Sequence, residues 1–442
     1  MSEKEATGAT GSRSILDRYF GYGIAGSSFR TEVLAGVTTY LTMVYIIFVN
    51  PAMLATTGMD FGAVFVATCL AAALSTAIMG IYANYPIALA PGMGLNAYFA
   101  FVVVPQFGGD WRTALGCVFF SGLLFLGLSL SPLREWLINS IPRAMKSAIA
   151  AGIGFFLAMI GLQNAGIVVA DKATLVTLGT FTIPALLAAG GFIVLAGLAA
   201  RKVPGAIIIT VIGVTALAVI MGLQPVEGIA AMPPSLAPTF MQMNLGGAIE
   251  AGFVTIVLVF LLIDLLDTTG TLVSVAARAG MQDEKGHLPR LRRALTADSI
   301  ASMIGAMLGT STTTSYIEST AGVDAGGRTG LTAVVVALLF LASLFLAPLA
   351  HAVPIYATAP ALVFIACLMA RGLAEIDWDD LTDAVPAVIT ALAIPLTYSI
   401  ASGIGLGFLS YVGCKVLAGR PKEAGGAVLV IATAFALKLA FV

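Results

Sequence analysis

The chain of 442 residues is 59% hydrophobic and only 10% charged, and its mean hydropathy is +1.00. Soluble chains carry about 25% charged residues, so this composition excludes a water-soluble enzyme and predicts a polytopic membrane protein. One bilayer-spanning helix needs about 20 apolar residues, and the length therefore fits roughly 12 to 15 spans and no large soluble domain. The 22 basic and 23 acidic residues nearly cancel, so the bulk charge indicates neither nucleic acid nor an anionic partner.

Apolar runs in chain order predict about fourteen membrane spans. The first twelve are expected near residues 34–54, 62–82, 87–104, 114–130, 145–163, 182–199, 203–222, 249–275, 294–309, 311–325, 328–348 and 354–371. Two or three more lie between 383 and 441, where 384–400 and 403–418 are either two spans or one interrupted span before a final run at 425–441.

Lys and Arg residues predict the orientation, because cytoplasmic loops carry an excess of them. The polar stretch 1–33 lacks the pattern of a cleaved signal peptide, and we expect it to be a cytoplasmic tail. With the N-terminus inside, sixteen of the 22 basic residues are cytoplasmic, Arg112 and Lys172 are external, and the four in the C-terminal tail are left unassigned. The sequence thus predicts a multi-pass protein of the plasma membrane with a cytoplasmic N-terminus.

A Pro-rich stretch in the middle of the chain divides it into two halves. We expect residues 34–223 to form spans 1–7, 224–246 an external linker, and 247–442 spans 8–14. Weak similarity between LAGVTTYLTMVY at 34–45 and EAGFVTIVLVFL at 250–261 supports the division. Halves with an odd number of spans insert with opposite orientation, which is the inverted-repeat plan of many transporters, with a binding site near the membrane midplane.

Spans 3 and 10 are the two whose sequences do not favour a continuous helix. Pro91, Gly92 and Gly94 precede Asn96 in span 3, which predicts an extended stretch followed by a half-helix that starts near Asn96. The alternative is a Gly/Pro kink that only packs helices. In span 10 a run of Ser and Thr leads to Glu318, and hydroxyls stabilise helix ends. Both half-helices would begin at the same depth.

Aromatic residues flank these two predicted helix starts. Tyr98 follows Asn96, and Tyr316 precedes Glu318, so a flat ligand could stack on either ring. Hydroxyl-bearing residues of the first span, Tyr45 among them, are interpreted as packing, since such residues are common between membrane helices.

Span 8 carries two carboxylates, Asp264 and Asp267, which lie on roughly one face of a helix. A carboxylate at the bilayer centre costs several kcal/mol, so these residues should face a cavity, bind a proton or bond a ligand. We expect Asp267 to be functional, exposed by a break at 268–270. For Asp264 a role in the site and a protonated acid bonded to a neighbouring helix are weighed equally.

The remaining acids and the metal-ligand residues are interpreted structurally. Asp298 is expected to be a packing partner near the site, and Asp324 to pair with Arg328 at a helix end. Four widely spaced cysteines and the isolated His287 and His351 match no metal pattern, so neither a metal nor another cofactor is expected.

Carboxylates and one amide, with no basic side chain deep in the membrane, predict the chemistry of the ligand. Carboxylates accept hydrogen bonds from planar N–H donors and repel anions, which favours a small, neutral, planar N–H-bearing molecule, with an acid free to take a coupling proton. An intramembrane enzyme would need a positioned nucleophile, base or metal, and no His or Cys lies near these acids. A ligand-gated sensor remains an alternative.

Four strings in these segments resemble the AzgA-type adenine/guanine/hypoxanthine permeases of the nucleobase-cation symporter-2 group. They are TTYLTMVYIIFVNPAML at 38–54, APGMGLNAYFA at 90–100, DLLDTTGTL at 264–272 and TSTTTSYIESTAGV at 310–323. The resemblance covers nearly the whole chain.

This resemblance implies an all-α fold of fourteen spans in two inverted seven-span repeats, with a core domain of spans 1–4 and 8–11 and a gate domain of the others. It implies proton-coupled uptake of purine bases by an elevator-like movement of the core. Asp267 and Glu318 would bond the purine N–H edge, Asn96 would complete the contact, and Asp298 would support coupling; whether Asp264 touches substrate or tunes Asp267 stays open. A pyrimidine or xanthine permease, or an anion carrier of the same fold, is the alternative, and the oligomeric state, a homodimer included, is not predicted.

Overall fold

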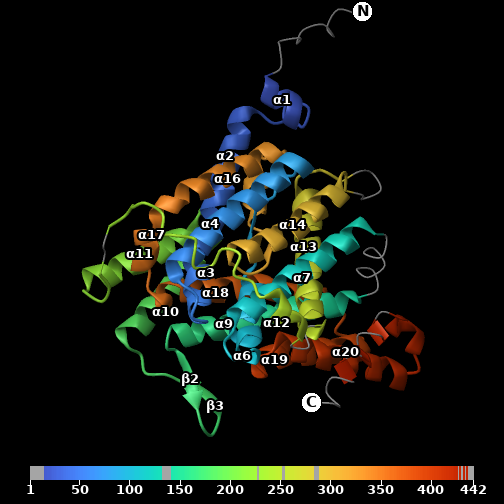
Figure 1. Cartoon of the computed structure of the whole chain (residues 1–442). Helices are drawn as coiled ribbons and strands as arrows, with labels where there is room; N and C mark the ends of the chain where they lie inside the picture. Colours follow the sequence, from blue (N-terminus) through green and yellow to red (C-terminus); the bar gives the residue numbers. More distant parts are fainter. Residues whose placement is uncertain are drawn as a thin grey trace, which may run out of the picture.

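The computed structural model describes residues 14–131, 141–225, 228–250, 254–282 and 288–426, together with 428, 429, 432, 433, 435 and 436. Most of the predicted run 425–441 therefore lies outside the described residues. The described part is predominantly helical, and four short strands interrupt it (Figure 1).

The first half of the chain begins with a short helix and continues through seven predicted spans. Its elements are α1 (Ile15–Phe20), α2 (Phe29–Met43), α3 (Ile46–Ala55), α4 (Phe61–Ile78), η1 (Met79–Ala83), β1 (Leu89–Pro91), α5 (Met93–Tyr98), η2 (Phe99–Val103), α6 (Val104–Gln106), α7 (Trp111–Leu130), α9 (Arg143–Asn164), β2 (Val168–Asp171), β3 (Leu175–Leu178), α10 (Ile183–Ala200) and α11 (Ala206–Ile220).

The second half consists of helices and one strand. Its elements are α12 (Leu245–Glu250), α13 (Val254–Arg278), α14 (Leu291–Leu308), β4 (Thr313–Ser315), α15 (Ser319–Asp324), α16 (Gly330–Ser343), η3 (Leu344–Leu346), α17 (Ala347–Ala352), α18 (Ile355–Met369), η4 (Ala370–Glu375), α19 (Leu381–Leu396), α20 (Ile400–Leu417) and η5 (Pro421–Ala424).

These elements confirm the prediction of a polytopic all-α membrane protein. Among the described residues, nine helices are long and apolar enough to cross a membrane, and three shorter apolar helices accompany them. The described residues contain elements in every range predicted up to residue 418. The doubt about 384–418 is resolved, because α19 and α20 are separate helices joined by a turn in which Tyr398 has a left-handed backbone (φ 52°).

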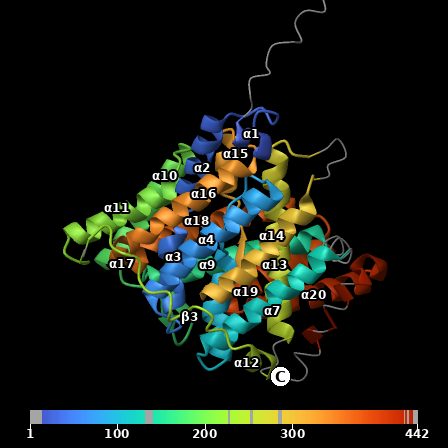
Figure 2. The same cartoon turned by 45° about the horizontal axis from the view of Figure 1, so that its top comes forward.

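The helices pack in two groups. The core group consists of α2, α3, α4, α5, α7, α13, α14, α15 and α16 with β1 and β4, and the gate group consists of α9, α10, α11, α18, α19 and α20. The two groups meet where α2 packs on α11, α3 on α18 and α5 on α9. This is the division into spans 1–4 with 8–11 and the others that the family resemblance implied. Figure 2 shows α4, α13, α14 and α16 side by side in the core group.

One feature of the fold is absent from the sequence prediction, a β-hairpin between α9 and α10. Strands β2 and β3 pair antiparallel there. The Asp171 carboxylate accepts the backbone N–H groups of Thr174 and Ala173 in the turn, and these hydrogen bonds hold its pKa below the usual range. The hairpin and α1 lie at opposite ends of the molecule (Figure 1).

A charge cluster joins the start of α19 to the end of α20. The Lys415 ammonium lies 2.7 Å from the Asp383 carboxylate, and the Arg420 guanidinium lies 2.7 Å from that of Asp380. The Thr382 hydroxyl and Arg420 both donate to Asp380 and hold its pKa well below the usual range. These ion pairs fix the gate helices to each other at one end.

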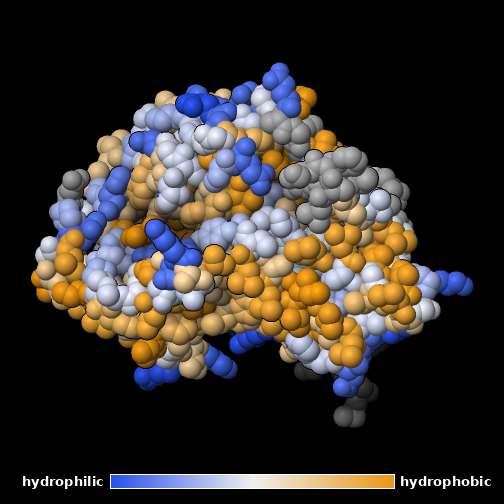
Figure 3. Space-filling view, turned by 90° about the horizontal axis from the view of Figure 1, so that it is seen from below, coloured by the Kyte–Doolittle hydropathy of each residue, from blue (hydrophilic) through white to orange (hydrophobic). Residues whose placement is uncertain are grey.

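The outer surface has the character expected of a protein in lipid. Leu186, Ile193 and Ile220 of the gate group are more than half exposed. Figure 3 shows broad apolar areas over one face of the molecule, far more than a soluble monomer presents.

Glycines allow the closest helix approach in the core group, where α16 meets η1. A Cβ atom added to Gly330 would overlap the carbonyl oxygen of Gly80, a backbone atom that no side-chain rotation can move. Small residues permit such approaches between membrane helices. We expect Gly330→Ala to destabilise the protein by about 1–3 kcal/mol or more, measured as a lower unfolding temperature in detergent.

Gly127 of α7 is the matched control for this substitution. A Cβ at that position meets nothing within 4 Å, so Gly127→Ala should leave the unfolding temperature unchanged or raise it slightly. Equal stability of Gly330→Ala and wild type would contradict the close approach of α16 to η1.

Candidate ligand-binding site

The two broken spans meet at the centre of the core group. Strands β1 and β4 pair antiparallel, with Ala90 opposite Thr314, and the Gly92 N–H donates to the Thr312 carbonyl (2.9 Å). Non-helical backbone at membrane depth is tolerated when its polar groups are satisfied within the protein, and each strand satisfies the other. The extended segments predicted for spans 3 and 10 are therefore confirmed.

A short helix leaves each strand. Helix α5 begins at Met93, one residue after Gly92, and continues through η2 and α6 to Gln106. Helix α15 begins at Ser319, directly after Glu318. The first start is three residues earlier than predicted, because the Asn96 N–H already donates to the Gly92 carbonyl (2.8 Å) and belongs to the first helical turn.

Asp264 and Asp298 lie in one buried hydrogen-bond network. The Ser302 hydroxyl donates to Asp264 (2.9 Å), and the Thr268 hydroxyl donates to Asp298 (2.8 Å) while lying 3.4 Å from Asp264. The Ser315 hydroxyl donates to the other oxygen of Asp298 (2.8 Å). All five residues are buried or nearly so, and the network ties α13, α14 and β4 together.

Asp267 stands apart from this network. The break predicted at 268–270 is wrong, because α13 is helical from Val254 to Arg278 and Thr268 turns its hydroxyl toward the carboxylates. The Asp267 side chain is nevertheless exposed, and it has no hydrogen-bond or ion-pair partner in the described part of the chain. Asp267 and Glu318 lie close enough for their charges to interact. Two of the predicted site residues are thus neighbours.

Glu318 has one side-chain partner that the sequence interpretation assigned to packing. The Tyr45 hydroxyl, at the start of α3, donates to a Glu318 carboxylate oxygen at 2.8 Å. The two residues are 273 positions apart, so no local pattern could have indicated the contact. Tyr45 itself is buried, whereas Glu318 is half-buried.

Asn96 is completely buried, yet neither atom of its side-chain amide has a hydrogen-bond partner among the described residues. An unsatisfied buried amide is costly, so a group of this kind commonly marks a place where a ligand or water bonds. Gly94 lies against the gate group, since a Cβ there would approach Ile153 of α9 to 2.5 Å.

The two tyrosines predicted to offer stacking surfaces are both buried. Tyr98 packs edge-on against Phe260 of α13 with 4.9 Å between ring centroids, and the Tyr316 hydroxyl donates to the Pro91 carbonyl (2.6 Å). Tyr316 thus supports the crossing of β1 and β4, and Tyr98 packs α5 against α13.

The predicted ion pair between Asp324 and Arg328 is wrong. Asp324 instead pairs with Arg278 at the end of α13, at 2.6 Å. The Arg328 guanidinium donates to the Val323 carbonyl, and the backbone N–H of Arg328 donates to the buried carboxylate of Glu32 (3.0 Å). Glu32 thereby accepts a backbone N–H just before the start of α16, a structural role that the sequence did not indicate.

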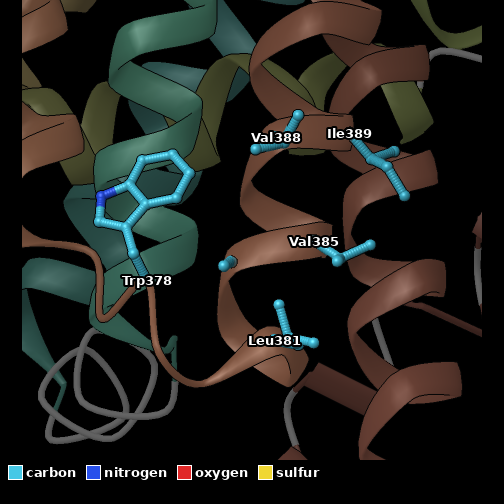
Figure 4. A pocket seen from close by; sticks show the side chains of 6 residues that line it. Trp378, Leu381, Val385, Val388 and Ile389 are labelled. Atoms are coloured by element: carbon cyan, nitrogen blue, oxygen red, sulfur yellow. The ribbon is translucent and has the colours of Figure 1, made fainter.

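An apolar groove lies elsewhere, on α19 in the gate group. Trp378, Leu381, Val385, Val388 and Ile389 line it (Figure 4), with Ala384, and none of them offers a carboxylate or amide to a polar ligand. In the residues described here, no group of three or more His, Cys, Asp or Glu side chains could hold a metal ion. His287 lies outside these residues.

Comparison with known proteins adds to this geometry. The model of the permease family that includes xanthine and uracil carriers matches residues 30–406. The chain is 52% identical to the permease-like protein MJ0326 of Methanocaldococcus jannaschii, with 96% of this chain and 98% of that protein covered. It is 45% identical to the adenine permease AdeP of Escherichia coli (100% and 99% covered) and 45% identical to the guanine/hypoxanthine permease PbuG of Bacillus subtilis (92% and 96%).

Among solved structures, the transmembrane domain of the cyanobacterial bicarbonate transporter BicA matches with a TM-score of 0.64. It covers 85% of this chain and 97% of that domain at 15% identity. The structure of SLC26A9 matches with the same TM-score over 91% of this chain and 69% of that one, at 10% identity. At these identities the likeness shows a shared fold.

Proposed function

The chain belongs to the permease family, and from that premise we propose that it carries purine nucleobases across a membrane, with hypoxanthine, guanine or adenine as substrate. The family consists of transporters, so the chain is a permease and not an enzyme. Relatives named adenine permease and guanine/hypoxanthine permease, similar over 92–100% of this chain, support the substrate class.

The observation that carries the proposal is a set of polar groups beside the strand crossing. Of these, Asp267 and Asn96 have no side-chain hydrogen-bond partner among the described residues, and Glu318 is bonded by Tyr45. Asp267 offers a free carboxylate, Glu318 a second one close by, and Asn96 an amide with both atoms unpaired. A purine presents N–H donors and ring nitrogen acceptors in one plane, and carboxylates and an amide are the complementary groups.

Uptake is coupled to protons in this proposal. Asp267 and Glu318 bind substrate and take up the proton, and Asp264 and Asp298 hold it in the adjoining network. Carboxylates without a basic partner at membrane depth suit groups that load and release a proton during transport.

Movement follows the division between the two helix groups. The core group, with the site at its centre, slides as an elevator past the gate group. The contact of Gly94 with Ile153 supports this assignment, because a residue without a side chain leaves the facing surface of α5 smooth where the groups meet.

The protein lies in the plasma membrane with its N-terminus in the cytoplasm. The ends of the molecule that carry α1 and the β2–β3 hairpin are opposite each other (Figure 1), as this orientation requires. Residues 34–223 and 247–442 form the inverted repeats, with 224–246 as the external linker. Cross-linking in membranes would test assembly as a homodimer.

Uptake of labelled bases into cells that lack their own purine permeases tests the function. We expect saturable, proton-dependent uptake of hypoxanthine, guanine or adenine, and competition by unlabelled purines. Competition by uracil or xanthine alone would indicate a different nucleobase. Because the fold is shared with a bicarbonate transporter, bicarbonate belongs in the panel, and transport of that anion without purine transport would refute the proposal.

Tyr45→Phe should weaken transport although the residue is far from the other site residues in sequence. It removes the hydroxyl that donates to Glu318, and hydrogen bonds to charged groups contribute about 1.5–3 kcal/mol. We expect hypoxanthine uptake at low concentration to fall by about 10-fold or more. Tyr40→Phe is the control, since the Tyr40 hydroxyl contacts Ser343 instead; equal uptake by both variants would remove Tyr45 from the site.

A further inference from the structure

A row of buried hydroxyl groups leads into β4 from the end of α14. The side-chain oxygens of Ser311, Thr312 and Thr313 are completely buried, and none has a hydrogen-bond partner among the described residues. Hydroxyls that only pack membrane helices bond to a carbonyl one turn back, as Thr210 and Thr215 do in α11. The row therefore does not follow the pattern of packing residues.

Asn50 of α3 faces the outer end of this row and adds an acceptor to it. Its amide nitrogen donates to the hydroxyls of Thr68 (2.7 Å) and Thr310 (2.9 Å). The Thr68 hydroxyl gives its own proton to the Val64 carbonyl, so the orientation of the Asn50 amide is fixed. The Asn50 side-chain oxygen is buried and has no partner in the described chain, so it is free to accept.

The inner end of the row reaches the buried carboxylates. The Ser302 hydroxyl lies 3.1 Å from the Thr313 carbonyl and 2.9 Å from an Asp264 oxygen, so it links the strand to the acid. Asp264 faces Asp298 of α14 and lies near Asp267 of its own helix, and among the described residues no Lys or Arg side chain contacts this network. A proton that arrives at Ser302 meets carboxylates and no fixed positive charge.

The outer end lies beneath the segment 228–244. The Thr239 hydroxyl donates to the Leu308 carbonyl (3.1 Å), and the Met241 N–H donates to the Met307 carbonyl (2.7 Å). This segment belongs to the linker that the proposed orientation places outside the cell. The row thus runs inward from the covered external end of α14.

Energetics favour water along this row. A buried polar group that lacks a hydrogen bond costs about 1–3 kcal/mol, and a buried site with several such groups commonly holds ordered water. Side chains of an extended chain alternate between its two faces, so these hydroxyls join into one chain through bridging water. Hydroxyls and waters that bond to one another in this way pass protons along a chain of hydrogen bonds.

We propose that residues 310–313 and Asn50 form a hydrated route by which the coupling proton travels from the external face to Asp264. This inference rests on the proposed proton-coupled uptake. The route uses neutral hydroxyls at the start of β4 and in the residues just before it. It is separate from the carboxylates that touch the substrate.

The test uses the purified full chain in liposomes and the double variant Ser311→Ala/Thr312→Val. Two quantities are measured: hypoxanthine-dependent proton influx with a trapped pH dye under an acid-outside gradient, and exchange of labelled for unlabelled hypoxanthine without a gradient. We expect proton influx and concentrative uptake to fall at least about 10-fold, with exchange close to that of wild type, because exchange needs the carrier but no net proton entry.

Two further variants control for structure. Ser311→Thr/Thr312→Ser retains both hydroxyls and should restore proton influx, and Thr215→Val removes a hydroxyl that only packs α11 and should change neither quantity. Unchanged proton influx in the double variant would overturn the proposed route, as would a parallel loss of influx and exchange. Hypoxanthine transport by wild type without any proton movement would instead refute the coupling on which the inference rests.

Discussion

Asp267→Asn is expected to abolish concentrative purine uptake while the protein remains folded. The Asp267 carboxylate is exposed and has no partner among the described residues, so its replacement by a neutral amide breaks no contact within the protein. The variant loses the charge that accepts the purine N–H and takes up the proton. Hydrogen bonds to charged groups contribute about 1.5–3 kcal/mol, which corresponds to uptake about 10- to 100-fold lower at low hypoxanthine concentration.

The control for Asp267→Asn is the same substitution at Asp324. That carboxylate pairs with Arg278 at the end of α13, where both side chains are at least half exposed. Exposed ion pairs contribute about 0–1 kcal/mol, so Asp324→Asn should transport like wild type. Both variants should unfold at the wild-type temperature in detergent. Normal uptake by Asp267→Asn would exclude this residue from the site.

The sequence predicted the features of the fold that arise from local chemistry. Hydropathy alone gave the spans, because lipid requires long apolar helices whatever their partners are. Pro91 and Gly92 marked the strand before α5, since proline lacks a backbone donor and glycine permits non-helical angles. The run of Ser and Thr before Glu318 marked the non-helical segment that contains β4.

Contacts between distant residues were the part that the sequence did not show. The segment from Thr268 to Gly270 looked like a helix break, yet α13 continues through it and the Thr268 hydroxyl donates to Asp298, 30 residues away. Asp324 pairs with Arg278 and not with its near neighbour in sequence. Tyr45 looked like packing until the fold placed it against Glu318. Each of these depends on how α2, α3, α13, α14 and α15 pack, which no local pattern specifies.

Position in the network distinguishes the acids that hold the fold from the acid that is free for substrate. Asp298 accepts hydrogen bonds from Thr268 of α13 and Ser315 of β4, both at 2.8 Å, and so connects three elements of the core group. Asp267 makes no such connection. Substitutions at these two carboxylates should therefore differ in kind: one changes transport alone, and the other changes stability as well.

Asp298→Ala is expected to destabilise the protein by about 1–3 kcal/mol or more, because it leaves the buried Ser315 hydroxyl without its acceptor and leaves the Thr268 hydroxyl only the Asp264 oxygen 3.4 Å away. Thermal unfolding in detergent measures the loss. Asp298→Asn keeps one carbonyl oxygen as acceptor, so its unfolding temperature should lie between those of Asp298→Ala and wild type, while proton-coupled uptake is lost in both because neither side chain can hold the proton. Asp377→Ala, at an exposed position, is the control and should match wild type in both measurements. An Asp298→Ala protein as stable as wild type would show that the network of Asp264 and Asp298 does not hold α13, α14 and β4 together.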